Sequence, residues 1–346
     1  MIIPHSRPII DQDDIRAVSE VLASGQIAQG EKVREFEEAV AGYVGTKYAV
    51  ACSSGTSALH LALVGLGISK GDEVVIPSYV CSSPYFAVLH AGATPVVADV
   101  SLADLNLCAE TVKKHISSKT KAIILPHMFG TPAELDGLLE LGVPIIEDCA
   151  HSLGSEYRGR RVGSFGELSI VSFYATKMIT TGEGGMVLTS NEEFYRRIVD
   201  VKDYDKKSLT TMRYNYKMTD FQAALGLSQL KKLSVFVERR RRIASLYGKR
   251  FLGYGVETLG VPSHKRAVFY RYIIMVDDLE GVQRCVKEKG VMCERPVFNP
   301  LHRFLSAVSC PNSDKVYERV LSVPIYPSLS EREVEYVFET FDEVFG

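Results

Sequence analysis

VPIIEDCAH, which spans Val143–His151, is the stretch that decides the fold. Its apolar residues occupy consecutive positions rather than alternate ones, and KAIIL at Lys121–Leu125 shows the same pattern. Consecutive apolar residues are typical of a strand that is buried on both faces of a parallel sheet. Two carboxylates, Glu147 and Asp148, end the first stretch, and we expect them at the edge where open α/β sheets bind ligands.

Short apolar runs of this kind alternate with helical patterns along the first two thirds of the chain. This alternation predicts a doubly wound α/β fold with a mostly parallel sheet. Helices are predicted between most of the strands, for example at Thr56–Leu66 and Ala133–Leu141. The strands are predicted at Tyr48–Cys52, Glu73–Pro77, Pro95–Asp99, Ala122–Pro126, Pro144–Asp148, Leu168–Phe173 and Met186–Thr189.

The alternation stops near residue 235, where helices and strands no longer follow each other at βαβ length. We therefore expect a large α/β domain at residues 1–235 and a smaller α+β domain at residues 236–346. The elements predicted around and after this boundary are helices at Thr219–Leu233 and Val235–Phe251, a strand at Val268–Val276, and helices at Leu279–Glu288 and Glu331–Val344.

The composition is that of an ordinary globular protein and favours neither nucleic acid nor membrane as a partner. The chain has 346 residues and a net charge of −2, so it lacks an overall field that would attract phosphate backbones or anionic lipids. Pro4 and Pro8 interrupt the N-terminus, and no apolar run approaches the roughly 20 residues that cross a bilayer. The basic run Arg239–Arg242 points to all sides of a helix, which favours a solvated or subunit-facing surface.

The cysteines and histidines indicate reduced thiols and no metal site. No two cysteines have C-x-x-C spacing, and no two of the eight histidines have H-x-x-x-H spacing. An odd, dispersed set of cysteines is typical of a reducing compartment, so we expect a cytoplasmic protein. The seven cysteines are Cys52, Cys81, Cys108, Cys149, Cys285, Cys293 and Cys310.

The segment SSGTSALHLAL, Ser53–Leu63, indicates a phosphate-binding turn. A strand is predicted to end at Cys52, and Gly55 then allows another group to approach the backbone at the start of a helix. Backbone amides at a helix N-terminus carry partial positive charge, and the hydroxyl groups of Thr56 and its serine neighbours add donors. The same residues also fit a plain helix N-cap, so this turn alone leaves both interpretations open.

Asp148 and Lys177 are the candidates for cofactor chemistry. A carboxylate at the end of a buried strand needs a cation to offset its desolvation, and a protonated pyridine nitrogen would supply one. Lys177 lies between a predicted buried strand and the Gly-rich turn Gly182–Gly185, and amines in such places serve as Schiff-base nucleophiles. The alternatives are a helix-capping Asp148 and an exposed loop lysine. One predicted strand separates the two residues, so both reach one cleft.

Seven segments spread along the chain resemble, in the same order, successive signatures of the DegT/DnrJ/EryC1/StrS aminotransferases. These are the sugar-aminotransferase branch of fold-type-I pyridoxal-phosphate (PLP) enzymes. The resemblance runs from SRPII near the N-terminus to PLH at Pro300–His302. It implies a fold-type-I PLP-transferase with a smaller C-terminal α+β domain and pyridoxal 5'-phosphate as cofactor. The segments are SGTSALHLAL, GDEVVIPSY, HAGATPVVADV, PHMFGTPAELD, IIEDCAHSLG, SFYATKMITTGEGGM and YNYKMTDFQAALGLSQL.

The resemblance implies catalytic roles residue by residue. Lys177 matches the Schiff-base lysine of the family, and Asp148 matches the carboxylate that pairs with the pyridine nitrogen. His151 matches the residue near the phenolic oxygen of the cofactor. Ala150 matches the small residue under one face of the ring.

The resemblance also implies cofactor-binding roles and a homodimer. Gly55, Thr56 and Ser172 match phosphate-binding positions. Asn215 matches an asparagine that reaches the phosphate across the subunit interface, which implies a homodimer with two shared active sites. Cys81 departs from the pattern, because the family usually has an aromatic residue there that stacks on the cofactor ring; Tyr79, Tyr85 or Phe86 are possible substitutes.

The reaction implied is a ping-pong transamination from L-glutamate to a keto group of a nucleotide-linked sugar. Sugar dehydratases of the family resemble this chain but have a histidine in place of Lys177. A non-catalytic regulatory member of the fold is a further alternative, and a dehydrogenase is disfavoured because no G-x-G-x-x-G follows the first strand. Candidates for substrate contact are Arg7, Arg213, Tyr214, Arg271 and His302.

Overall fold

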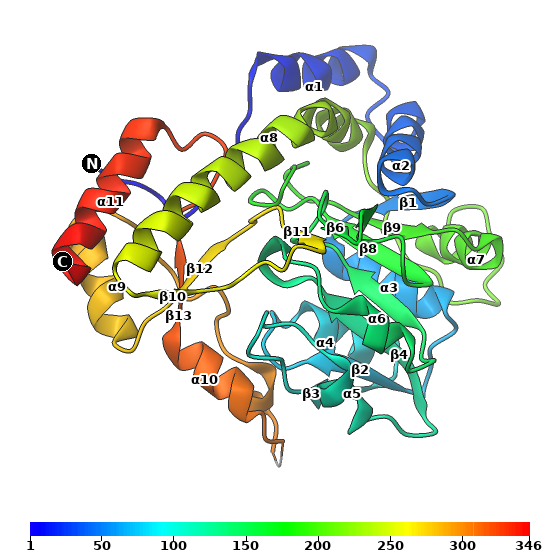
Figure 1. Cartoon of the computed structure of the whole chain (residues 1–346). Coiled ribbons are helices and arrows are strands. Elements are labelled where there is room, and N and C mark those ends of the chain that lie inside the picture. Colours follow the sequence, from blue (N-terminus) through cyan, green and yellow to red (C-terminus); the bar gives the residue numbers. More distant parts are fainter. Residues whose placement is uncertain (307) are drawn as a thin grey trace.

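The computed structural model describes residues 1–306 and 308–346, which form an α/β fold around a seven-stranded sheet (Figure 1). The strand order is β1-β9-β8-β5-β4-β2-β3. β9 runs antiparallel to β1 and β8, and the other neighbours pair in parallel. The strands are β1 Tyr48–Cys52, β2 Glu73–Pro77, β3 Thr94–Ala98, β4 Thr120–Pro126, β5 Ile145–Asp148, β8 Leu168–Ser172 and β9 Gly185–Thr189.

Both faces of this sheet are buried, as the apolar runs predicted. Ile123 and Leu125 of β4 belong to one hydrophobic core, whereas Ala122 and Ile124 belong to another. Alternate residues of a strand point to opposite faces, so the two cores lie on opposite sides of the sheet. The helices of this part are α2 Glu31–Val44, α3 Gly55–Gly65, α4 Ser83–His90, α5 Ala109–Lys113, α6 Leu135–Leu139 and α7 Glu192–Lys202.

A single helix, α8 at Asp220–Gly253, replaces the two helices expected at Thr219–Leu233 and Val235–Phe251. Ser234 does not interrupt it, because serine costs less than about 1 kcal/mol in a helix interior and Leu233, Phe236 and Val237 are buried around it. In Figure 1 α8 runs from beside α1 (Gln12–Ser24) and α2 to the C-terminal elements. The predicted domain boundary after residue 235 falls inside this helix, and the division into two domains stays a prediction.

The C-terminal part has a second, antiparallel sheet of order β10-β12-β13. The predicted strand Val268–Val276 is shorter than expected, because the amides of Val268 and Arg271 donate to the carbonyls of Gly130 and Phe129 instead of to the sheet. The remaining elements are β6 Glu156–Tyr157, β7 Arg160–Arg161, β10 Glu257–Thr258, β11 Lys265–Arg266, β12 Tyr272–Met275, β13 Val320–Val323, α9 Leu279–Glu288, α10 Pro311–Arg319 and α11 Glu331–Phe345.

Hydrophobic cores extend through both parts of the chain, and α8 contributes to two of them. None of the helices in the described part of the chain is both long and apolar enough to cross a membrane. The parallel strands β4, β5 and β8 all end on the same edge of the large sheet, at Pro126, Asp148 and Ser172. This is the edge at which a ligand is expected.

Candidate active site

A cavity of about 250 Å³ lies at this edge of the sheet. Lys177, Asp148 and His151 line it, so the structure brings the three predicted catalytic residues together. It also gathers the predicted cofactor-binding residues, apart from Asn215. The members of the predicted set that line the cavity are Gly55, Thr56, Cys81, Asp148, Ala150, His151, Ser172 and Lys177.

The start of α3 forms a cradle with free backbone amides. Ser54 caps the helix by accepting a hydrogen bond from the amide of Ser57 at 3.0 Å, and the first intrahelical bond runs from Ala58 to the Ser54 carbonyl. The amides of Gly55 and Thr56 therefore have no partner within the helix. The structure confirms the N-cap and leaves these amides able to bind an anion, so the phosphate-binding role stays a prediction that the cap does not exclude.

Asp148 is a buried carboxylate that points into the cavity. Its Oδ1 accepts a hydrogen bond of 3.0 Å from the amide of Ala150. Burial raises the pKa of the Asp148 carboxyl above its usual 3.8, and the hydrogen bond from Ala150 and the charge of Lys177 offset that rise only in part. A cation placed next to Asp148 would therefore stabilise the ionised carboxylate. A protonated ring nitrogen is such a cation, and the carboxylate would in turn keep it protonated.

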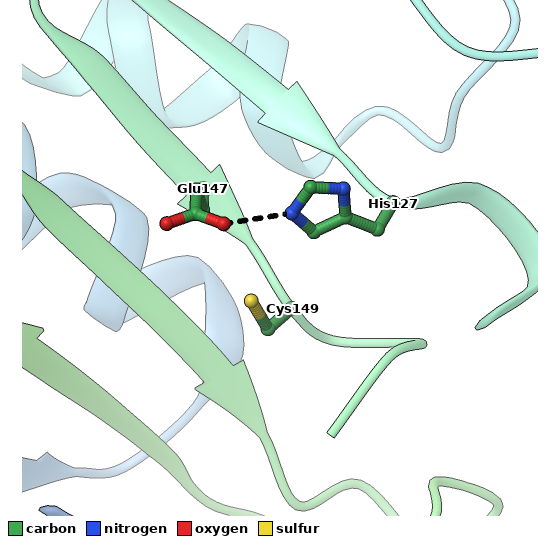
Figure 2. Close-up of side chains that lie close together, drawn as sticks. All are labelled: His127, Glu147 and Cys149. Carbon is green, nitrogen blue, oxygen red and sulfur yellow. Dashed lines mark hydrogen bonds and ion pairs between the residues drawn. The ribbon is translucent and has the colours of Figure 1, made fainter. Parts of the chain in front are cut away.

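Glu147 precedes Asp148 on β5 but points to the opposite face of the sheet. Figure 2 shows its carboxylate bonded to His127, with an Nε2–Oε2 distance of 3.0 Å. The amides of Gly163 and Gly166 also donate to Glu147, each at 2.8 Å. Although burial raises the pKa of Glu147, the hydrogen bonds from His127 and these amides outweigh it and lower the pKa below 4.5.

His127, Glu147 and Cys149 lie close enough to resemble a metal site (Figure 2). The amide of Ala133 donates to His127 Nδ1 at 3.1 Å, so Nε2 carries the proton given to Glu147. Burial raises the pKa of the Cys149 thiol well above its usual 9.0, which disfavours the thiolate that binds metals. His127 and Glu147 already use their polar atoms in hydrogen bonds to each other and to backbone amides.

Lys177 lies beside the ring of Tyr270. Its backbone amide donates to the Tyr174 carbonyl at 2.9 Å, and its Nζ lies 5.1 Å from the ring centroid of Tyr270. The ring of Tyr270 stacks on that of His151 with centroids 4.3 Å apart. Burial lowers the pKa of His151 well below 6.5, and the charges of Lys177 and Arg271 lower it further. His151 is therefore a neutral imidazole near pH 7.

Sequence reasoning missed Tyr270, which contacts both His151 and Lys177. It lies far from them along the chain and belongs to none of the segments on which the resemblance was built. The hydrogen bonds of Val268 and Arg271 to the loop at Gly130 bring it to the site, and no local pattern predicts that pairing.

Asn215 is exposed and does not line the cavity of its own chain. It forms an isolated β-bridge with Asp203 at the end of α7. Its predicted role is to contact the phosphate of a cofactor bound in the partner subunit, and this role requires a position outside the cavity of its own chain. That role stays a prediction.

The candidates for substrate contact are bonded to other parts of the protein. Arg213 pairs with Asp200 at 3.0 Å, and Arg7 pairs with Glu333 at 3.2 Å. His302 is buried, and its Nδ1 lies 2.6 Å from Ser78 Oγ.

Two of these candidates lie against aromatic rings. The ring of Tyr214 stacks on that of Tyr216, with centroids 5.0 Å apart. The guanidinium of Arg271 lies 4.7 Å from the ring centroid of Tyr270, and this places it next to Lys177 and His151.

Cys81, at the position where the resemblance implied an aromatic ring, lines the cavity. Tyr79, Tyr85 and Phe86 do not line the cavity as far as residues 1–306 and 308–346 show, and the side chain of Tyr79 is buried at 1% exposure. Tyr174, on the loop before Lys177, does line it and is 47% exposed. Tyr174 is therefore better placed than the three residues named from the sequence to cover a bound ring.

Comparison with known proteins gives a consistent result over the whole chain. Residues 8–342 match the DegT/DnrJ/EryC1/StrS aminotransferase family. The spore coat polysaccharide biosynthesis protein SpsC of Bacillus subtilis is 35% identical over 99% of this chain and 97% of its own. The GDP-perosamine synthase of Escherichia coli O157:H7 is 34% identical over 99% of both chains.

Solved structures agree with this result. The PLP form of Spr1654 from Streptococcus pneumoniae, a chain assigned as a sugar aminotransferase, superposes with a TM-score of 0.94. It is 27% identical and the match covers 99% of this chain and 98% of that one.

Proposed function

The chain belongs to the DegT/DnrJ/EryC1/StrS aminotransferase family, and on this premise we propose that it transfers the amino group of L-glutamate to a keto group of a nucleotide-linked sugar. It is a PLP-dependent aminotransferase of the sugar-aminotransferase type. The nucleotide-linked substrate is supported by the relative named as a GDP-perosamine synthase. A role in polysaccharide biosynthesis is supported by the SpsC relative.

The observation that carries this proposal is that Lys177 and Asp148 line one cavity together with the amides of Gly55 and Thr56. PLP has an aldehyde, a pyridine nitrogen and a phosphate, and this cavity offers an amine, a buried carboxylate and a helix N-terminus for them. The close approach of Gly55 to Ser172 supports the same fit, because a side chain at residue 55 would fill the cradle. The residues present therefore fit PLP.

Each residue has a distinct task in the reaction. When bound, PLP supplies an electron sink for the carbanion that forms at the donor Cα. Lys177 Nζ would act as the general base that takes the proton from the donor Cα, and as the general acid that gives it back later in the cycle. The Asp148 carboxylate would hold the proton on the ring nitrogen, and the Gly55 and Thr56 amides would bind the phosphate. The neutral His151 imidazole would lie near the phenolic oxygen.

The proposal includes a homodimer in the cytoplasm. Asn215 is exposed on the loop that follows α7, where it is free to contact a second copy of the chain. In the proposed dimer each cavity takes Lys177 from one subunit and Asn215 from the other.

The absorption spectrum of the purified protein tests this function. The PLP-loaded protein should have a visible band that glutamate bleaches and a nucleotide-linked keto sugar restores. A colourless protein that takes up no added PLP would contradict the proposal. A band that no amino donor bleaches would favour a regulatory protein of the same fold.

A further inference from the structure

Three cations, Lys177 of the cavity wall and Arg240 and Arg271 near it, have no ion pair with a carboxylate in the described part of the chain. Arg240 is 3% exposed, its Nη1 donates to backbone carbonyls including that of Ile325 at 2.8 Å, and its buried Nε has no hydrogen-bond partner. A buried cation without a counter-charge is costly, so this cluster requires an explanation.

Tyr270 lies at the centre of these cations. Its ring is contacted by the Lys177 ammonium at 5.1 Å and by the Arg271 guanidinium at 4.7 Å, both measured to the centroid. Its hydroxyl lies 3.3 Å from Thr176 Oγ1 and 3.4 Å from Arg271 Nη2. Arg240 Nη1 lies 3.3 Å from the Tyr270 backbone carbonyl.

The electrostatics of the cluster lower the pKa of the Tyr270 phenol. Burial raises the pKa of Tyr270, but the charges of Lys177 and Arg271 oppose burial and outweigh it. The hydrogen bond from Thr176 and the charge of Arg240 act in the same direction, and the resulting pKa is about 8 instead of 10. The titratable ring of His151 also contacts Tyr270, but it is held neutral.

We propose that Tyr270 is a positioning residue for the transamination, in which its ring orients His151 and Lys177 and its hydroxyl, when it loses its proton, balances the charge of Lys177. The role of Tyr270 rests on the proposed function. Tyr270 does not line the cavity in the described part of the chain, so it acts through Lys177 and His151.

Tyr270 affects the reaction because Lys177 alternates between a charged and an uncharged form. Lys177 is cationic when it is free and protonated, and it loses that charge when it acts as a base or is bound covalently to the cofactor. The phenolate stabilises the cation and holds the amine against the ring, near the proton it must move. The charge on Tyr270 is therefore coupled to the state of Lys177.

The ionisation of Tyr270 can be measured in cofactor-free protein. The chain has 17 tyrosines and no tryptophan, so the ultraviolet band of tyrosinate is free of indole absorbance. One tyrosine should ionise near pH 8 in the wild type, and this step should be absent from Tyr270→Phe. The matched control is Tyr272→Phe, because burial raises the pKa of Tyr272 to about 12 and its removal should leave the step unchanged. Absence of the step in the wild type, or its persistence in Tyr270→Phe, would overturn the proposal.

The coupling to Lys177 has its own test. Lys177→Met removes the ammonium and keeps the side-chain length, so the Tyr270 step should move to higher pH. In the loaded enzyme, Tyr270→Phe should lower kcat about tenfold or more and change KM for the amino donor little. An unmoved step in Lys177→Met, or an unchanged kcat in Tyr270→Phe, would refute the positioning role.

Failure of this proposal and failure of the proposed function give different results. A protein that shows the step near pH 8 but catalyses no transamination would contradict the proposed function while leaving the ionisation of Tyr270 intact. A protein that transaminates normally without the step would contradict only the role of Tyr270.

Discussion

Gly55 and Ser172 approach each other so closely that a Cβ atom on residue 55 would lie 2.9 Å from the Cβ of Ser172. The first residue of α3 thus packs against the last residue of β8, with no space for a side chain between them. This contact holds the free amides of α3 at the end of the strand that leads to Lys177. The proposed cofactor cradle and the strand that precedes Lys177 are therefore held together by this contact.

Gly55→Ala should weaken PLP binding by about tenfold or more, because the new methyl group displaces either Ser172 or the start of α3. Equilibrium binding of PLP to the cofactor-free protein measures the effect. Gly42→Ala is the control, since Gly42 is an exposed residue of α2 with open space around its Cα. It should bind PLP normally and gain up to about 1 kcal/mol in stability. Equal PLP affinity in the two variants would contradict the cradle.

Asp148→Asn should keep the fold and the ability to bind PLP but lower kcat by about a hundredfold or more. The amide has nearly the same shape, but it cannot hold the positive charge of a protonated ring nitrogen. The rate of the half-reaction with the amino donor, followed by absorbance, measures this change. An Asp148→Asn enzyme with wild-type kcat would remove Asp148 from the mechanism.

Glu147→Gln should destabilise the protein by about 3 kcal/mol, since it breaks a buried pair with His127 and leaves hydrogen-bonding groups unpaired. The folded-state pKa of Glu147 lies below its usual 4.5, so its stabilisation is present above pH 4.5 and lost as the pH falls. Urea unfolding at several pH values measures both effects. Glu193→Gln, which affects an exposed pair with Arg197, should change stability by less than about 1 kcal/mol. A similar small change in Glu147→Gln would contradict the structural role of the buried pair.

Mixing two inactive variants tests the shared active site. Lys177→Ala and Asn215→Asp should each be inactive, the first without its nucleophile and the second with a charge that repels the phosphate. Mixed dimers combine Lys177 of one subunit with Asn215 of the other and restore one site. Random exchange of subunits should recover about a quarter of wild-type activity. No recovery in mixtures shown to contain mixed dimers would contradict the proposed role of Asn215.

The strands and the cradle could be predicted because their signals are local. Short apolar stretches around Ile145–Asp148 and Leu168–Ser172 predicted buried strands, and the structure confirms both within one residue of the expected ends. Gly55 and Asp148 stand directly after or at the end of such strands, so the sheet topology brings them to one edge.

The errors came from interactions between distant segments. Two helices were predicted where α8 is continuous, and buried residues on both sides of Ser234 keep the helix unbroken. Tyr270 could not be assigned to the site because its position depends on hydrogen bonds between residues 268–271 and the loop at Gly130. Glu147 and Asp148 are adjacent in sequence, and only the direction of each side chain in the strand distinguishes the supporting residue from the catalytic one.

Covalent capture of the cofactor tests the central role of Lys177 most directly. Borohydride reduction of the PLP-loaded protein, followed by proteolysis and mass spectrometry, locates the lysine that carries the pyridoxyl group. We predict one modified peptide, labelled at Lys177, and no labelling of that peptide in Lys177→Ala. A label on another lysine, or none in a protein that has bound PLP, would contradict the account.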